Sequence, residues 1–246
     1  TGVRHGRVFS EVVTMTQHEQ TAEPAHPHGH DEGGDIDVET MFSPAFWDER
    51  YSMSDKIWSG NPNPRLLEHI SGVEAGTALD VGSGEGADAI WLAERGWRVT
   101  GIDVSVVALE RAAQHASARG ADIAERITWQ QVDLMAGDVL PDSYDLVTAQ
   151  FMHLPGREAL HRRLTAAVRP GGILLIVGHH PSDLETMANR WKLRELMFTA
   201  EDIVPTLEPH EWEILVADAP SRQAVDPAGD PVTIHDAVLL ARRRIA

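Results

Sequence analysis

Apolar positions along the chain follow two spacings that alternate with each other. Short apolar runs, typical of buried parallel strands, occur at 77–81, 98–102, 127–132, 144–149 and 173–177. Helical spacing, with suitable caps, occupies 64–70, 87–95, 105–119 and 157–168. Alternation of this kind predicts an α/β fold with a doubly wound, mostly parallel sheet that helices cover on both faces.

The spacing changes after the fifth predicted strand. We expect helices at 183–199 and 200–207, followed by strands at 211–217 and 235–242. The loop between these last strands is rich in Pro, Gly and Asp, which favours antiparallel pairing. The whole pattern predicts a seven-stranded, Rossmann-like sheet that ends in an antiparallel hairpin.

Residues 1–40 lack either spacing. They hold two arginines against eight acidic residues, and five of the 13 histidines. Such a polar segment buries too little surface to offset its ordering entropy, so we expect a disordered tail before one domain at 41–246. Its cluster of His26, His28, His30 and Asp31 is suited to weak binding of a divalent metal. The simpler interpretation is a flexible tail whose histidines have no role.

Charge and composition narrow the class of protein. A formal net charge of −17 disfavours a nucleic-acid partner, because an acidic surface repels phosphate backbones. The chain has no cysteine, which excludes disulfides, thiolate zinc sites and a cysteine nucleophile. We find neither an apolar run of about 18–20 residues nor a secretory signal. We therefore expect a cytoplasmic protein with no membrane partner.

A glycine-rich loop, Asp80-Val81-Gly82-Ser83-Gly84-Glu85-Gly86-Ala87, follows the first predicted strand. Its glycines permit a tight turn and close approach of a ligand, while the next helix supplies free amide hydrogens. The loop also fits a looser dinucleotide pattern. At the end of the second strand, Asp103 is placed to accept two hydrogen bonds from a ribose diol. The alternative for Asp103 is a helix cap that precedes Ser105.

The end of the third predicted strand carries a second acidic residue. Asp133 is placed to accept the amino group of adenine, while Leu134 packs on the ring. The alternative is a loop aspartate that starts a turn before Pro141. Together, Asp103 and Asp133 predict a pocket of adenosine size.

These segments together resemble the class I S-adenosylmethionine-dependent methyltransferases. The resemblance runs through 79–86, Asp103, Asp133, 144–147 and the Pro-Gly-Gly at 170–172, and covers about 41–246. It implies S-adenosylmethionine as the cofactor. The cofactor-binding residues that we expect are Trp47, Tyr51, Trp58, Asp80, Gly82, Ser83, Gly84, Glu85, Gly86, Asp103, Val104, Asp133, Leu134 and Gln150.

The aromatic segment before the loop indicates a subgroup within this family. Phe46-Trp47-Asp48-Glu49-Arg50-Tyr51 and Ile57-Trp58-Ser59-Gly60-Asn61-Pro62 are similar to a bacterial subgroup close to the tellurite-resistance and thiopurine methyltransferases. In those relatives this segment folds over the cofactor. A sulfonium cation also favours aromatic faces, by about 0.5–2 kcal/mol per contact. The alternative is that these rings only pack a helix onto the sheet.

The region after the fourth strand bears on the methyl acceptor. Ala149-Gln150-Phe151-Met152 stands where methyltransferases that act on amino groups of DNA, RNA or protein glutamine carry Asp/Asn-Pro-Pro-Tyr. This difference and the acidic charge favour a small-molecule acceptor. His153 is our candidate base or acceptor contact, and His179 or His180 is expected to line the acceptor pocket. The alternative for His153 is a histidine bonded to the backbone.

Methyl transfer from a sulfonium is an in-line displacement, so holding the acceptor in line supplies much of the catalysis. A neutral oxygen or nitrogen acceptor needs a base, whereas a thiolate or an oxyanion does not. Other classes stay open: a catalytically silent protein that binds an adenosyl ligand, or an NAD-dependent oxidoreductase. A metal site formed by His153, one of the two later histidines and Asp145 is disfavoured, because that acid lies inside a strand.

Overall fold

The computed structural model describes residues 42–54, 57–137, 140, 143–184, 194–226 and 229–245. Its helices are α1 (Pro44–Ser52), α2 (Pro64–Ile70), α3 (Ala87–Glu94), α4 (Val106–Arg119), α5 (Ala121–Ala124), α6 (Arg157–Ala167) and α7 (Ala200–Ile203), with 3-10 turns η2 (Pro181–Leu184) and η4 (Val204–Thr206). Its strands are β1 (Thr77–Val81), β2 (Arg98–Asp103), β3 (Ile127–Gln131), β4 (Tyr144–Gln150), β5 (Val168–His179), β6 (Trp212–Asp218), β7 (Ser221–Val225) and β8 (Pro231–Arg243).

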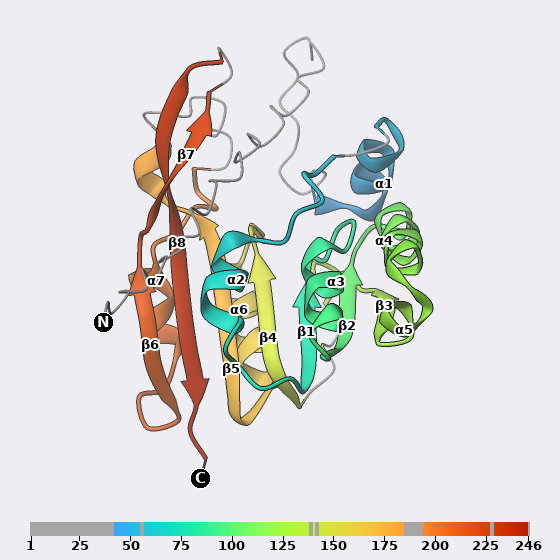
Figure 1. The fold of residues 1–246 in the computed structure, drawn as a ribbon. Helices are drawn as coiled ribbons and strands as arrows, with labels where there is room; N and C mark the ends of the chain where they lie inside the picture. The colour runs from blue at the N-terminus through green and yellow to red at the C-terminus, as the bar shows by residue number, and fades with distance from the viewer. Residues whose placement is uncertain are drawn as a thin grey trace, which may run out of the picture.

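The strands form one sheet in the order β3-β2-β1-β4-β5-β8-β6 (Figure 1). The first five of these run parallel, and β8 pairs antiparallel with β5 and with β6. The predicted doubly wound sheet with a closing antiparallel hairpin is therefore confirmed. An eighth strand, β7, pairs with the early part of β8 and lies off the main path.

Alternate residues of each strand pack against helices on opposite faces of the sheet. On one face Leu79 and Val81 join α6 and α7, and on the other face Ala78 joins α2 and α3. The helices begin as their sequences predict: the Ser105 hydroxyl accepts the Ala108 amide and caps α4. Both faces thus bury apolar surface, and the polar groups gather at the carboxyl ends of the strands.

Two projections stand above the carboxyl edge of the parallel strands (Figure 1). At one end, α1 packs against α4. At the other end, β8 continues past the end of β5, where His179 pairs with Asp236, and residues 231–235 pair with β7 instead. The carboxyl edge of the parallel strands therefore lies between α1 on one side and the β7–β8 hairpin on the other.

Several predicted boundaries were wrong. Pro170, Gly171 and Gly172 lie within β5 rather than before it, beside an irregularity in the register of β4 and β5. The loop expected after 217 contains β7, which pairs along its length with the extension of β8 and packs Ala224 against Ile234. Residues 194–199 form a turn and an extended segment instead of the end of a helix.

Other expectations fall partly or wholly outside the described residues. These are the N-terminal tail with its histidine cluster and the middle of the helix expected at 183–199. In the part of the chain that the structure describes, no helix has the length and apolar character needed to cross a membrane.

Candidate functional site

The glycine loop forms a tight turn between β1 and α3. Gly82, Gly84 and Gly86 all adopt positive φ angles, of +74°, +51° and +87°, which side chains other than glycine rarely tolerate. The amides of Gly82 and Ser83 both donate to the Ile102 carbonyl at 2.9 Å, which ties the loop to the end of β2. The loop is therefore a fixed backbone cradle at the carboxyl edge of the sheet.

Asp103 joins this loop to α4. Its carboxylate accepts hydrogen bonds from the amides of Gly84 and Ser105, each at 2.9 Å. It therefore binds both the glycine loop and the N-cap residue of α4. Burial raises the pKa of Asp103, although these amides oppose the shift. Each oxygen retains lone pairs for a further donor, which is what binding of a ribose diol requires. Beside it, the Val104 carbonyl accepts the Gln131 side chain.

Trp129 on β3 supports the loop, and the sequence interpretation missed it. A Cβ added to Gly101 would lie 2.4 Å from its ring, and one added to Gly86 would lie 2.7 Å away. The indole therefore fills the space that two glycines leave open. A glycine inside a strand indicates such a close approach, so Gly101 was the available signal.

The N-terminal aromatic segment covers the other side of the loop. Trp58 Nε1 donates to the Tyr51 hydroxyl at 2.9 Å, and that hydroxyl lies 3.0 Å from where a Cβ on Gly84 would stand. Burial, followed by the charge of Asp103, raises the pKa of Tyr51 well above its ordinary value. Trp47 contacts Phe46 and Tyr51 within α1. The segment thus lies against the loop through Tyr51 and Trp58, and contact of Trp47, Tyr51 or Trp58 with a cofactor stays a prediction.

Glu85 fastens this segment in place. Arg111 donates to Glu85 Oε1 at 3.1 Å, and the amides of Ile57 and Trp58 lie 3.3 Å from Oε2. The other guanidinium nitrogen of Arg111 donates to the Tyr51 carbonyl at 2.7 Å. The carboxylate contacts observed here hold the N-terminal segment against the loop. Contact between Glu85 and a cofactor stays a prediction.

Three buried side-chain oxygens near the loop have no hydrogen-bond partner among the described residues. They are Asp80 Oδ2, Ser83 Oγ and Gln150 Oε1. They come from the end of β1, the loop and the end of the adjacent β4. Burial, with further effects from Asp88 and Asp103, raises the pKa of Asp80.

Burying such an oxygen without a donor costs about 1–3 kcal/mol of folding free energy. A ligand that donates a hydrogen bond to it removes this cost. S-adenosylmethionine carries an ammonium group and two ribose hydroxyls, all of them donors. An ammonium group would also favour the charged form of the Asp80 carboxylate. The residues present therefore fit this cofactor.

Asp133 and Leu134 lie farther along the edge. Asp133 Oδ1 accepts the amides of Met135 and Ala136 at 2.9 and 3.0 Å, as expected of an aspartate that starts a turn. Leu134 is buried with the cluster on the α6 face. Contact of either residue with adenine stays a prediction.

The residues expected to line the acceptor pocket include a stack of rings at the carboxyl ends of β4 and β5. The His179 ring lies 4.6 Å from Phe151 and 4.9 Å from His153, between centroids. His153 Nδ1 lies 3.2 Å from the Leu196 carbonyl, and its Nε2 lies 3.4 Å from the His179 amide. Both ring nitrogens thus face the main chain, which agrees with the alternative given for His153. Its role as a base stays a prediction.

Two other candidate residues, His180 and Asp145, lie apart from this ring stack. His180 Nδ1 lies 2.8 Å from the Ser182 hydroxyl, outside the ring stack. Asp145 lies at the start of β4, where it accepts the amide and hydroxyl of Thr77 and pairs with Arg169. Asp145 therefore cannot serve as the acidic ligand of the metal site considered above, because Asp145 and His153 lie at opposite ends of β4.

One protein-family model matches the middle part of the chain. Residues 78–172 match the model of a family described as "Methyltransferase domain". The chain is 32% identical over 135 residues to the methyltransferase GfsG of Streptomyces halstedii, covering 53% of this chain and 48% of that one. It is 29% identical over 164 residues to 2-heptyl-1-hydroxyquinolin-4(1H)-one methyltransferase of Mycobacteroides abscessus, covering 60% and 70%.

A third relative is the ubiquinone biosynthesis O-methyltransferase of Sodalis glossinidius, 29% identical over 64% of this chain and 65% of its own length. The chain thus spans only about half of GfsG and just under two thirds of this enzyme.

Solved structures share the fold. A chain from a study of the conversion of a disulfide bond into a thioacetal group during echinomycin biosynthesis has a TM-score of 0.63 at 23% identity, covering 82% of this chain and 91% of that one. TehB of Haemophilus influenzae has a TM-score of 0.59 at 16% identity, covering 82% and 67%. At such identities the likeness concerns the fold alone.

Proposed function

We propose that this chain, which carries a class I S-adenosylmethionine-dependent methyltransferase domain, transfers a methyl group from S-adenosylmethionine to a small-molecule acceptor by in-line displacement. The single observation that carries the proposal is the glycine cradle with the buried oxygens of Asp80, Ser83 and Gln150, for which the described part of the chain supplies no hydrogen-bond partner. The cofactor supplies, when bound, a methyl group on a sulfonium whose carbon–sulfur bond breaks with the electron pair left on sulfur.

The chain's own residues bind and orient. Asp103 would take the ribose diol from its position between the Gly84 and Ser105 amides. Asp80 and Gln150 would take the amino-acid ammonium group. Tyr51 and Trp58, latched by Glu85, would shield the reaction from water, as the segment lies against Gly84.

The acceptor would approach from the carboxyl ends of β4 and β5. Met152 Sδ lies 3.0 Å from the position of a Cβ on Gly82, so the residues after β4 directly adjoin the cradle. The named relatives that act on a hydroxyquinolone or in ubiquinone biosynthesis support a small acceptor with a ring hydroxyl. The closer kinship to tellurite-resistance and thiopurine enzymes, a cytoplasmic location and the absence of a nucleic-acid partner remain proposals.

Turnover against a panel of acceptors tests this function. The full chain is incubated with methyl-labelled S-adenosylmethionine and thiols, phenols, amines or chalcogen oxyanions, and labelled product is measured. We expect methylation of at least one phenol or other small acceptor. Binding of the cofactor without any methyl transfer would favour the alternative, a catalytically silent protein that binds an adenosyl ligand.

A further inference from the structure

We propose that Phe151 and Arg222 form an acceptor subsite for a planar aromatic compound that carries a negative charge, such as a phenolate or an aryl carboxylate. The inference rests on the proposed function, because it specifies the acceptor part of the same candidate site. It depends on the position of Phe151, on the ring stack beside it and on the charges of the β7–β8 hairpin.

Phe151 is held in an unusual backbone conformation next to the glycine loop. Its φ angle is +53°, which is uncommon for an aromatic residue and typical of functional positions. Its amide donates to the Val177 carbonyl at 2.7 Å, which fixes the turn after β4. Because Val81 pairs with Ala149, the turn at Phe151 lies beside the start of the glycine loop.

The Phe151 ring is half-buried, whereas the two histidine rings beside it are buried. Its centroid is 4.6 Å from that of His179 at an interplanar angle of 31°, and His179 stacks on His153. Aromatic rings favour offset or edge contacts with another aromatic ring. The exposed part of the Phe151 ring therefore suits a planar acceptor better than an aliphatic one.

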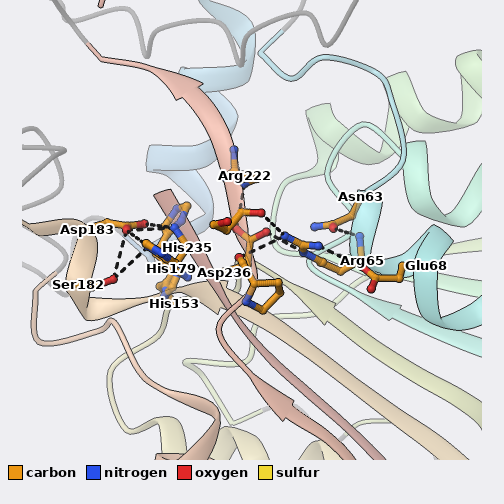
Figure 2. Close-up of polar contacts among 12 residues, drawn as sticks. Asn63, Arg65, Glu68, His153, His179, Ser182, Asp183, Arg222, His235 and Asp236 are labelled. Atoms are coloured by element: carbon orange, nitrogen blue, oxygen red, sulfur yellow. Dashed lines mark hydrogen bonds and ion pairs between the residues drawn. The ribbon is translucent and has the colours of Figure 1, made fainter. Parts of the chain in front are cut away.

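Arg222 brings a positive charge to this surface. Its guanidinium carbon lies 5.8 Å from the Phe151 ring centroid, and its Nε donates to Asp236 Oδ1 at 3.0 Å. Arg65 donates to the other oxygen of Asp236, also at 3.0 Å, so one carboxylate lies between two guanidinium groups (Figure 2). Asp236 is only 2% exposed, and because Arg65 also pairs with Glu68, the two arginines and the two carboxylates of this cluster balance in charge.

The two arginines have different tasks. Arg65 also donates to Glu68 and to the carbonyls of Pro220 and Ser221, which secures the start of β7 to α2. Arg222 lies within β7, and its side chain is 20% exposed beside Phe151. Arg222 is therefore the cation that an acceptor on the ring would meet. A planar guanidinium group matches carboxylate and phenolate oxygens well.

An anionic acceptor also agrees with the surroundings of His153, whose two ring nitrogens face main-chain atoms. A phenolate needs no base, because no proton leaves it during the transfer. Its oxygen lone pair forms the bond to the methyl carbon while the carbon–sulfur bond breaks and its electron pair remains on sulfur. The products are a neutral methyl ether and a thioether.

Binding of matched acids and amides tests the subsite. The full chain is saturated with S-adenosylhomocysteine and titrated with benzoate and 2-naphthoate, and with the corresponding neutral amides. We expect each acid to bind about ten-fold or more tightly than its amide, the ratio expected for one charged hydrogen bond. Arg222→Gln should abolish this preference, and Arg222→Lys, which keeps the charge, should retain part of it.

Arg162→Gln is the matched control, since it removes the same charge from a side chain that is 67% exposed on α6. It should keep the full preference for acids. Equal binding of acids and amides, no binding of either, or an unchanged preference in Arg222→Gln would overturn the subsite. Failure of the unmodified chain to bind S-adenosylhomocysteine would overturn both the subsite and the proposed function, whereas its binding without any preference for acids would overturn the subsite alone.

Discussion

The cofactor half and the acceptor half of the candidate site are assembled in different ways. Most of the cofactor half comes from one loop and the end of the next strand, residues 80–86 and Asp103, and only Gln150 is added from β4. The acceptor half joins Phe151 and His179 to Arg222, which a C-terminal hairpin contributes. A local motif therefore defines the first half, whereas the second half exists only once the sheet is complete.

The two halves also differ in how well their buried side-chain oxygens are satisfied. The cofactor half retains three buried oxygens without a partner among the described residues. In the acceptor half, Asp236 accepts from two arginines, and Asp183 accepts the His235 amide. The comparison teaches that the carboxylates of the acceptor half are held by protein donors, whereas the oxygens of the cofactor half are suited to the donors of a ligand.

Asp103→Ala should have the largest effect, because it should weaken ligand binding in the cofactor half. The change removes the acceptor for the Gly84 and Ser105 amides and for a ribose diol. We expect about 3 kcal/mol of lost binding energy, or roughly 100-fold weaker binding of S-adenosylhomocysteine, measured by calorimetry. Asp145→Ala is the control, because that carboxylate also binds a main-chain amide but lies at the far end of β4. Equal affinities of the two variants would contradict the assignment of Asp103.

Gly101→Ala should have the next largest effect, through packing rather than charge. The new Cβ would lie 2.4 Å from the Trp129 ring, which would be forced against the loop at Gly86. Overpacking of this kind destabilises by about 1–3 kcal/mol, and urea unfolding measures it. Gly72→Ala is the control, since nothing lies within 4 Å of its Cβ position. Equal free energies of unfolding for the two variants would show that Trp129 does not support the loop.

His161 allows a pH test on the face of the sheet that α6 covers. Burial, with a smaller effect of Arg157, lowers the pKa of His161 to about 4. The unfolded chain, with an ordinary histidine pKa near 6.5, then binds more protons between these values, so stability is full above pH 6.5 and falls as the pH drops toward 4. We expect this residue to account for about 2 kcal/mol of the stability lost between pH 7 and pH 5.

Urea unfolding of His161→Leu at the two pH values measures this contribution. The loss of stability between pH 7 and pH 5 should be smaller than in the unmodified chain. His210→Gln, at an exposed histidine, should leave the loss unchanged. An identical loss in His161→Leu and the unmodified chain would show that His161 is not buried in its neutral form.

His153→Gln should have the smallest effect, because glutamine can also donate to the Leu196 carbonyl and accept the His179 amide. We expect turnover to fall by less than about ten-fold, with an unchanged pH profile. A general base contributes about 100-fold or more. A loss of that size, with the basic limb of the pH profile removed, would restore His153 as the base.

The sequence predicted the local elements well. The bounds of α2 and β1 agree residue for residue with the expected ones, and Ser105 caps α4 as expected. These features depend on neighbouring residues: proline at the start of a helix, a hydroxyl at a cap, an apolar run before glycines. The glycine loop was recognisable for the same reason.

The sequence did not predict features that depend on contacts between distant segments. β7 has no strong apolar pattern of its own, and only its pairing with β8 makes it a strand. The Glu85–Arg111 ion pair and the approach of Arg222 to the Phe151 ring join residues far apart in the chain. Of these distant contacts, only the approach of Trp129 had a local signal, the glycine inside β2.

Calorimetric titration of the full chain with S-adenosylhomocysteine, in parallel with NAD, tests the central claim most directly. The account predicts one site per chain with a Kd tighter than about 0.1 mM for the adenosyl compound, and no measurable binding of NAD. Absence of binding by S-adenosylhomocysteine, or tighter binding of NAD, would contradict it.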